Sequence, residues 1–320
     1  MSFTKPWLLA VLLVPLLTAC GEDEPIVEPP PEDPNPAATL FREVFSTGAY
    51  GRLREAESAL LSRYAEDPTD AENTFLLAGL YMWEIAEWER DPSRGNQAYY
   101  AQLMKLDRYM SEAVQLDPSR GIARCFLGVA RLFRAQPERN PALATEGQNH
   151  LNKCIELHPQ FGLLLIPIGY HAQPVASSQY QRGVAEIFNR IDSCIDAKID
   201  RENPDLGPYV DRMNNFQPPY HACWNIDRAL YNLEGFWMLA GNMLVKNNRP
   251  DVAKILYRNV KYSQLSFDRW VYKDEFLELE RTADARAALY QDADRTNDPP
   301  VLRGAIQCVQ CHEKKPAPQP

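Results

Sequence analysis

Two cysteines and a histidine lie close together near the carboxyl end of the chain. Cys308 and Cys311 are separated by two residues, and His312 directly follows the second cysteine. This C-x-x-C-H spacing is that of c-type haem attachment, because two thiols so placed reach both vinyl groups of one haem while the adjacent imidazole lies under the iron. The sequence therefore predicts one covalent haem c on Cys308 and Cys311, with His312 as the proximal iron ligand.

A redox-active dithiol and half of a zinc site are the other uses open to this cysteine pair. A zinc site needs further ligands, and a thioredoxin-like dithiol is expected to follow a strand and to begin a helix. Here the motif follows TNDPPVLRGAIQ, and eight residues come after His312. No methionine follows Cys311, so the class I cytochrome c pattern is not matched. The stretch CVQCHEKK resembles the end of the last helix of class II cytochromes.

A sixth iron ligand would have to come from another part of the chain. His221 follows an irregular, proline-rich stretch and His171 ends an apolar segment. Positions beside loops are suited to reach a docked cofactor, so His221 and then His171 are the candidates. Iron without a sixth ligand is the alternative, and would suit gas binding or peroxide chemistry rather than electron transfer.

The amino terminus has the form of a lipoprotein signal peptide. In residues 1–19, Lys5 precedes an apolar stretch that is too short for a comfortable membrane span. The ending LTAC resembles the bacterial lipobox, which implies that Cys20 carries fatty acyl chains such as palmitate. Gly21 stands where aspartate would imply retention at the inner membrane. The resemblance therefore implies an outer-membrane anchor facing the periplasm; a soluble secreted protein is the alternative.

An acidic, proline-rich tether is expected to follow the lipid. Residues 20–36 hold six prolines and six acidic residues without a basic one, so they should stay extended and reach roughly 50 Å at ~3.1 Å per residue. The formal charge of the chain is −9, and loss of residues 1–19, which hold one lysine, takes it to −10. An acidic chain without a basic run is a poor nucleic-acid binder, so no nucleic-acid partner is expected.

Residues 37–293 are expected to form an all-α domain. Their apolar residues recur with helical periodicity. Asp70 is a candidate helix cap, and three prolines each precede a small residue by ten positions. The pairs are Pro68 and Ala78, Pro118 and Gly128, and Pro159 and Gly169. Over 49–265 this pattern resembles the tetratricopeptide repeat, which implies antiparallel helical hairpins stacked as a solenoid; a non-repetitive bundle is the alternative. Residues 294–320 would be a linker and haem-binding tail.

Four of the seven cysteines remain after lipid and haem are assigned. In an oxidising compartment four cysteines allow three pairings. Sequential pairing suits antiparallel hairpins, because one cysteine of each pair falls early in a helix and the other late in the neighbouring helix. The predicted disulfides are Cys125–Cys154 and Cys194–Cys223.

These features together predict an electron carrier rather than an enzyme. A membrane-anchored monohaem cytochrome would exchange electrons with a redox or envelope protein docked on the helical domain, since stacked hairpins present extended binding faces. The first alternative is a scaffold lipoprotein of an envelope complex, with a structural or sensory haem. The second is a peroxidase-like haem enzyme, which is disfavoured because dihaem peroxidases need two C-x-x-C-H motifs and the sequence has one.

Overall fold

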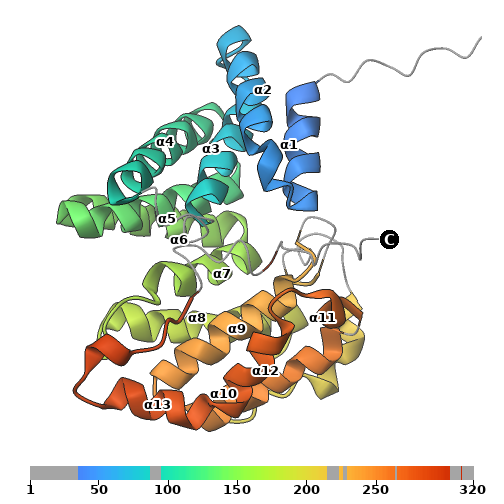
Figure 1. Ribbon diagram of the computed structural model, residues 1–320, viewed down its shortest axis with the longest axis vertical. Coiled ribbons are helices and arrows are strands. Elements are labelled where there is room, and N and C mark those ends of the chain that lie inside the picture. Colours follow the sequence, from blue (N-terminus) through green and yellow to red (C-terminus); the bar gives the residue numbers. More distant parts are fainter. Residues whose placement is uncertain are drawn as a thin grey trace, which may run out of the picture. The chain divides into compact units, whose positions relative to one another are not determined.

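The computed structural model describes residues 35–86, 95–214, 223–225, 229–263, 265–302 and Cys311. The chain divides into two units after residue 34, and the fold given below is that of the second unit, residues 35–320. In the described ranges the regular structure is α-helix with short 3-10 segments and no β-strand, which confirms the predicted all-α class (Figure 1).

The α-helices account for most of the described residues, and short 3-10 segments join several of them. The α-helices are α1 Pro36–Thr47, α2 Leu53–Glu66, α3 Ala71–Ala86, α4 Gly95–Leu116, α5 Gly121–Glu138, α6 Pro141–Leu157, α7 Pro159–Tyr170, α8 Ser178–Ile195, α9 Asn232–Lys246, α10 Pro250–Arg258, α11 Leu265–Arg269, α12 Lys273–Arg281 and α13 Ala283–Gln291. The 3-10 segments are η1 Tyr50–Arg52, η4 Gly207–Asn214, η6 Asn259–Ser263 and η7 Arg295–Asn297.

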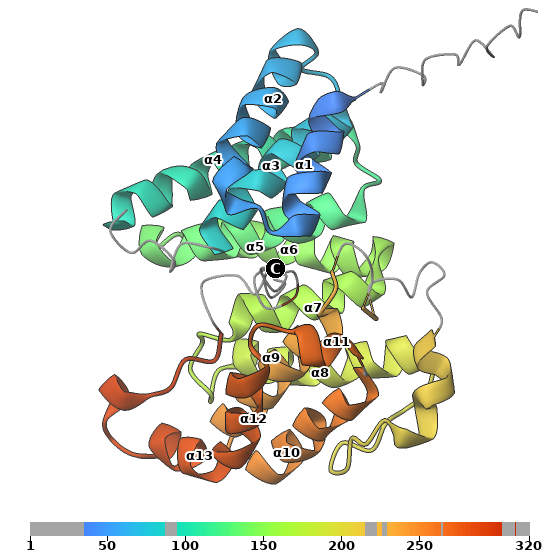
Figure 2. The same cartoon turned by 45° about the vertical axis from the view of Figure 1, so that its right-hand side comes forward.

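Helices α1 to α10 pack mainly against their neighbours in sequence, whereas α12 and α13 also pack against α9 and α10. The pairs α1 with α2, α3 with α4, α5 with α6, α7 with α8 and α9 with α10 are in contact, and α2 also contacts α3, α4 contacts α5, and α6 contacts α7 (Figures 1 and 2). Sequential hairpins that bury one face against the next hairpin have this order of contacts. The relation to tetratricopeptide repeats remains a prediction.

The Asp-Pro boundaries are turns built by the same side-chain chemistry. Asp67 Oδ1 accepts hydrogen bonds from the backbone N–H and the hydroxyl of Thr69, and Asp117 Oδ1 does the same with Ser119. The carboxylate of Asp70 then accepts from the backbone N–H of Asn73 at 2.9 Å, so it caps α3 as predicted. The aspartates thus end one helix and begin the next.

A small residue permits a close crossing of α5 and α6. A Cβ added at Gly128 of α5 would lie 2.7 Å from the Leu151 side chain and 2.8 Å from the carbonyl oxygen of Gly147, both on α6. The two backbones therefore approach more closely than any larger residue would allow. The Cys125–Cys154 disulfide joins the same two helices, with 5.1 Å between its Cα atoms. Because Cys125 faces Cys154 and Gly128 faces Leu151, α5 and α6 are antiparallel.

The second disulfide has the pairing expected from the sequence, but one of its cysteines does not lie in a helix as expected. Cys194 in α8 is bonded to Cys223, with 5.6 Å between Cα atoms. Cys223 was expected early in a helix, yet it lies in a turn and α9 begins only at Asn232. The reason is that Asn225 caps α9 from outside the helix: its Oδ1 accepts from the N–H of Leu233 at 2.8 Å.

Helix α9 is buried along almost its entire length and organises the second half of the domain. Asn242 is its polar centre, because its side-chain oxygen accepts from the Tyr257 hydroxyl at 2.6 Å and from Arg286 at 2.8 Å. Its amide donates to the carbonyl oxygen of Val301 at 3.0 Å. One side chain therefore connects α9 to α10, to α13 and to the segment that follows α13.

Candidate functional site

Cys311 is the one residue of the predicted haem motif that the structure describes. Its side chain is buried, and its carbonyl oxygen accepts a hydrogen bond from the backbone N–H of Tyr231 at 2.9 Å, directly before α9. Cys308 and His312 lie outside the described residues. Cys311 is thus hydrogen-bonded to the residue directly before the first turn of α9.

The Cys311 thiol lies among buried charged groups. Burial raises its pKa to about 12, and the positive charge of Arg190 on α8 opposes this without reversing it. The Arg190 side chain is itself 1% exposed and lies over the Phe236 ring at 4.0 Å, and burial lowers its pKa to about 10. A thiol with so high a pKa stays protonated at neutral pH, whereas metal ligation and nucleophilic attack need the thiolate.

The prediction of a covalent haem c has to be corrected. Within the described ranges, no group of three or more His, Cys, Asp or Glu side chains could hold a metal ion. Four cysteines are joined in disulfides, and Cys311 is enclosed beside Arg190 and Glu234. The sequence motif identified residue types with a suitable spacing, but the packing around Cys311 does not form an iron site from the residues described.

The structure does not bring the described candidate for the sixth ligand to Cys311. His171 follows α7, where its Nδ1–H donates to the carbonyl oxygen of Ile168 at 2.7 Å, and burial lowers its pKa. Its own carbonyl oxygen accepts from Lys246 at the last turn of α9. Because Cys311 is attached at the first turn, the two residues lie toward opposite ends of a 15-residue helix, about 22 Å long. His221 lies outside the described residues.

A row of half-buried rings crosses three helices at a different place. The Phe75 and Phe126 rings are stacked with centroids 6.4 Å apart, and Phe161 meets Phe126 edge-on at 5.3 Å. His158, which precedes α7, adds a fourth ring 5.9 Å from Phe161. Next to it Leu157, the last residue of α6, is 41% exposed. Aromatic rings that stay partly exposed and in contact are typical of binding surfaces.

One arginine in the turn before α5 borders these rings. Arg120 lies over the Phe75 ring at 4.9 Å and pairs with Glu72 and Asp117. We call this surface the aromatic edge and define it by five residues. They are Phe75, Phe126, Phe161, Leu157 and Arg120.

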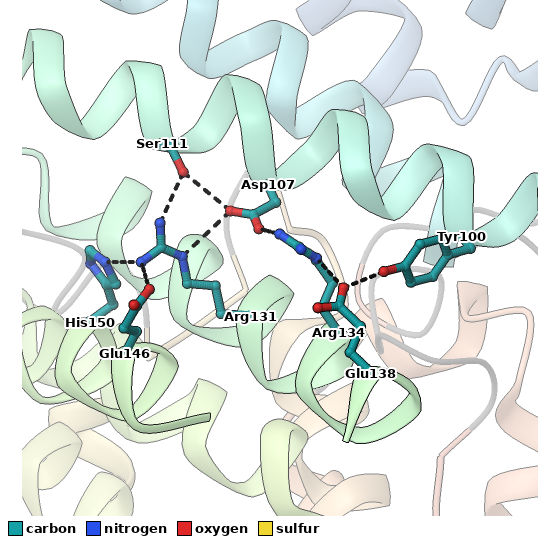
Figure 3. A network of polar contacts seen from close by, with 8 residues as sticks. All are labelled: Tyr100, Asp107, Ser111, Arg131, Arg134, Glu138, Glu146 and His150. Carbon is teal, nitrogen blue, oxygen red and sulfur yellow. Dashed lines mark hydrogen bonds and ion pairs between the residues drawn. The ribbon is translucent and has the colours of Figure 1, made fainter. Parts of the chain in front are cut away.

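A polar network holds α5 against α4 and α6. Figure 3 shows Asp107 of α4 between Arg131 and Arg134 of α5, while Arg131 also pairs with Glu146 of α6 at 2.7 Å and Arg134 bonds Glu138 at 2.8 Å. The carboxylate of Asp107 is largely buried, so its two arginines compensate the charge that burial would otherwise destabilise. The network links three helices and fixes the rotation of α5.

His150 belongs to the same network and is not a free ligand. Its Nε2 lies 3.2 Å from an Nη of Arg131, as Figure 3 shows. Burial and the adjacent positive charge of Arg131 lower the pKa of His150 to about 4. The imidazole is therefore neutral at physiological pH, and its role in the described part of the chain is structural.

The membrane-related predictions concern residues beyond the described ranges. Cys20 and most of the expected tether precede residue 35, so the lipid attachment remains a prediction. None of the described helices is long and apolar enough to cross a bilayer.

The comparisons with known proteins identify no relative. A scan against protein-family models found no match to the chain, and a search of curated protein sequences found none either.

Proposed function

We propose that the chain is a lipid-anchored helical scaffold of the bacterial cell envelope that binds a protein partner. The lipobox-like sequence at Cys20 and the acidic tether that follows it support the anchoring. The stacked hairpins support the binding role. Electron transfer through haem c is not part of the proposal, because the described residues form no site for its iron.

The aromatic edge is the observation that carries the binding role. Its three phenylalanines come from α3, α5 and α7, which belong to successive hairpins, and they remain partly exposed although they contact one another. Burying such rings against a partner is favourable by roughly 25 cal/mol for each Å² of apolar surface removed from water. A surface that crosses three hairpins would be broken by any change in their stacking, so the fold and the site depend on each other.

Fractionation and cross-linking of the full chain in its bacterial host test this function. The wild-type chain should be recovered with the outer membrane and should form a discrete cross-linked adduct with another protein in intact cells. The variant C20S should move to the soluble periplasmic fraction and lose most of the adduct, because the lipid concentrates both partners at one surface. A wild-type chain that is soluble, or that forms no adduct, would contradict the proposal.

A further inference from the structure

Helix α12 contributes few side chains to the core of the domain. Of its nine residues Phe276 alone is buried, whereas α9 buries all but one of its fifteen. Glu280 connects α12 to the rest of the domain by an ion pair with Arg258 of α10 at 2.8 Å. The other side chains of α12 are therefore wholly or partly exposed.

Four exposed residues form one face of this helix, which we call the α12 face. Their spacing of three, one and three positions places them within about 100° around the helix axis. They are Asp274, Leu277, Glu278 and Arg281. Leu277 is 47% exposed, more than any other large apolar side chain that the structure describes. Along the helix, the α12 face thus begins with an acid, has a leucine near its middle and ends with a base.

A groove of about 400 Å³ lies beside this face, between α10, α12 and α13. Among the described residues that line it, Leu277 is the one apolar side chain, and each of the three bases is paired with an acid. The pairs are Lys254 with Asp284, Arg258 with Glu280, and Arg281 with Glu278. Because these charges balance, the surface is complementary to a partner that carries both signs of charge around an apolar group.

We infer that two copies of the chain associate through the α12 face, with their α12 helices antiparallel. Asp274 and Arg281 are seven positions apart, about 10 Å along the helix axis at 1.5 Å per residue. A twofold axis midway between them, beside Leu277, sets Asp274 of each copy against Arg281 of the other and brings the two leucines together. The same surface supplies both halves of the contact, and the opposed helix ends add to the attraction.

The order of charges favours a second copy over a partner of one charge sign. An acidic segment laid along the α12 face would be attracted at Arg281 and repelled at Asp274, and a basic segment the reverse. An antiparallel copy is attracted at both ends by symmetry. Because α12 has nine residues and stable interfaces bury ~1,200 Å² or more, we expect a weak dimer with a dissociation constant on the order of 100 µM. The aromatic edge contributes no residue to this contact, so the inference does not depend on the proposed function.

Sedimentation equilibrium of the purified full chain in its C20S form tests the inference. Between about 10 µM and about 1 mM the average mass should rise from that of the monomer toward that of the dimer. L277K should weaken the association about tenfold or more, because it places two ammonium groups together beside the axis. D274R and R281D should each weaken it severalfold. The double variant D274R/R281D should restore it, because its charges pair again in the reverse order.

L116K is the matched control, because Leu116 at the end of α4 is 38% exposed and lies outside the α12 face. It should associate like the unsubstituted chain, and thermal unfolding shows whether each variant is folded. A chain that stays monomeric at about 1 mM, or an association that L277K leaves unchanged, would overturn the inference. So would a double variant that associates no better than the single ones. In intact cells, L277K should abolish a cross-linked adduct of twice the chain's mass and leave the adduct with another protein, so the inference and the proposed function can fail separately.

Discussion

Asp192 is the residue that fixes the turn after α8. Its carboxylate accepts hydrogen bonds from the backbone N–H of Ile199 at 2.9 Å, from Arg201 at 2.7 Å and from Lys198 at 2.9 Å. Burial by itself would raise the pKa of this carboxyl, but the bonds from Arg201, Ile199 and Lys198 outweigh it and lower the pKa to about 2. The charged form is therefore the one that the fold stabilises.

Replacing Asp192 by asparagine should destabilise the protein in a pH-dependent way. The folded pKa of about 2 lies below the ordinary value of 3.8, so the carboxylate contributes stability above pH 3.8 that is lost as the pH falls through 2. We expect D192N to lower the free energy of unfolding by about 2 kcal/mol at pH 7, discounted for partial exposure, and by less near pH 3. Urea unfolding at several pH values measures this, with D200N at an exposed site as control. A difference that is the same at all pH values would contradict this explanation.

The two disulfides have different effects on the elements that they join. Cys125–Cys154 connects α5 and α6, which already contact each other extensively. Cys194–Cys223 instead holds a short non-helical segment whose Asn225 caps α9. Each closes a loop of 29 positions, which is worth about 3.5 kcal/mol in the chain-entropy model. The two disulfides should therefore stabilise the folded chain by the same amount but affect different helices.

Removing each disulfide should show this difference by hydrogen exchange. In a C194A/C223A variant the segment 223–225 loses its anchor, so we expect amides in the first turns of α9 to lose protection ahead of the rest of the domain. In C125A/C154A the amides of α9 should lose protection only to the extent that the whole domain is destabilised, and not ahead of the other helices. The two variants control for one another. Uniform loss of protection in both would show that Cys223 does not hold the start of α9.

The sequence predicted features that depend on neighbouring residues better than features that depend on residues far away in the chain. Asp70 as a helix cap depends on residues within one turn, so it could be read directly. The start of α9 could not be predicted in this way. It is set by the Cys194–Cys223 disulfide and by Asn225, which caps α9 from outside the helix. The aromatic edge gave no signal, because Phe75, Phe126 and Phe161 belong to separate helices and have no common spacing. The haem prediction was wrong for a related reason: a spacing reports residue types and not the packing around Cys311.

At the scale of the whole molecule, the described residues after α13 pack against α9 at two places. The carbonyl oxygen of Val301 accepts a hydrogen bond from the Asn242 amide in the middle of α9. The carbonyl oxygen of Cys311 accepts one from the backbone N–H of Tyr231, just before that helix begins. Val301 and Leu302 are 6% and 5% exposed, so both belong to the hydrophobic core. Val301, Leu302 and Cys311 are therefore part of the fold rather than of an appendage.

A chain that ends after Asp298 should accordingly be much less stable. It loses the burial of Val301 and Leu302, at roughly 1.5–3 kcal/mol each, and leaves the Asn242 amide without its acceptor. We expect the free energy of unfolding to fall by about 4 kcal/mol, with increased binding of a hydrophobic dye to the uncovered face of α9. A chain that ends at His312 keeps every contact described for Val301 and Cys311, and it should unfold at the urea concentration of the full chain. Equal midpoints for both truncations would show that the segment does not stabilise α9.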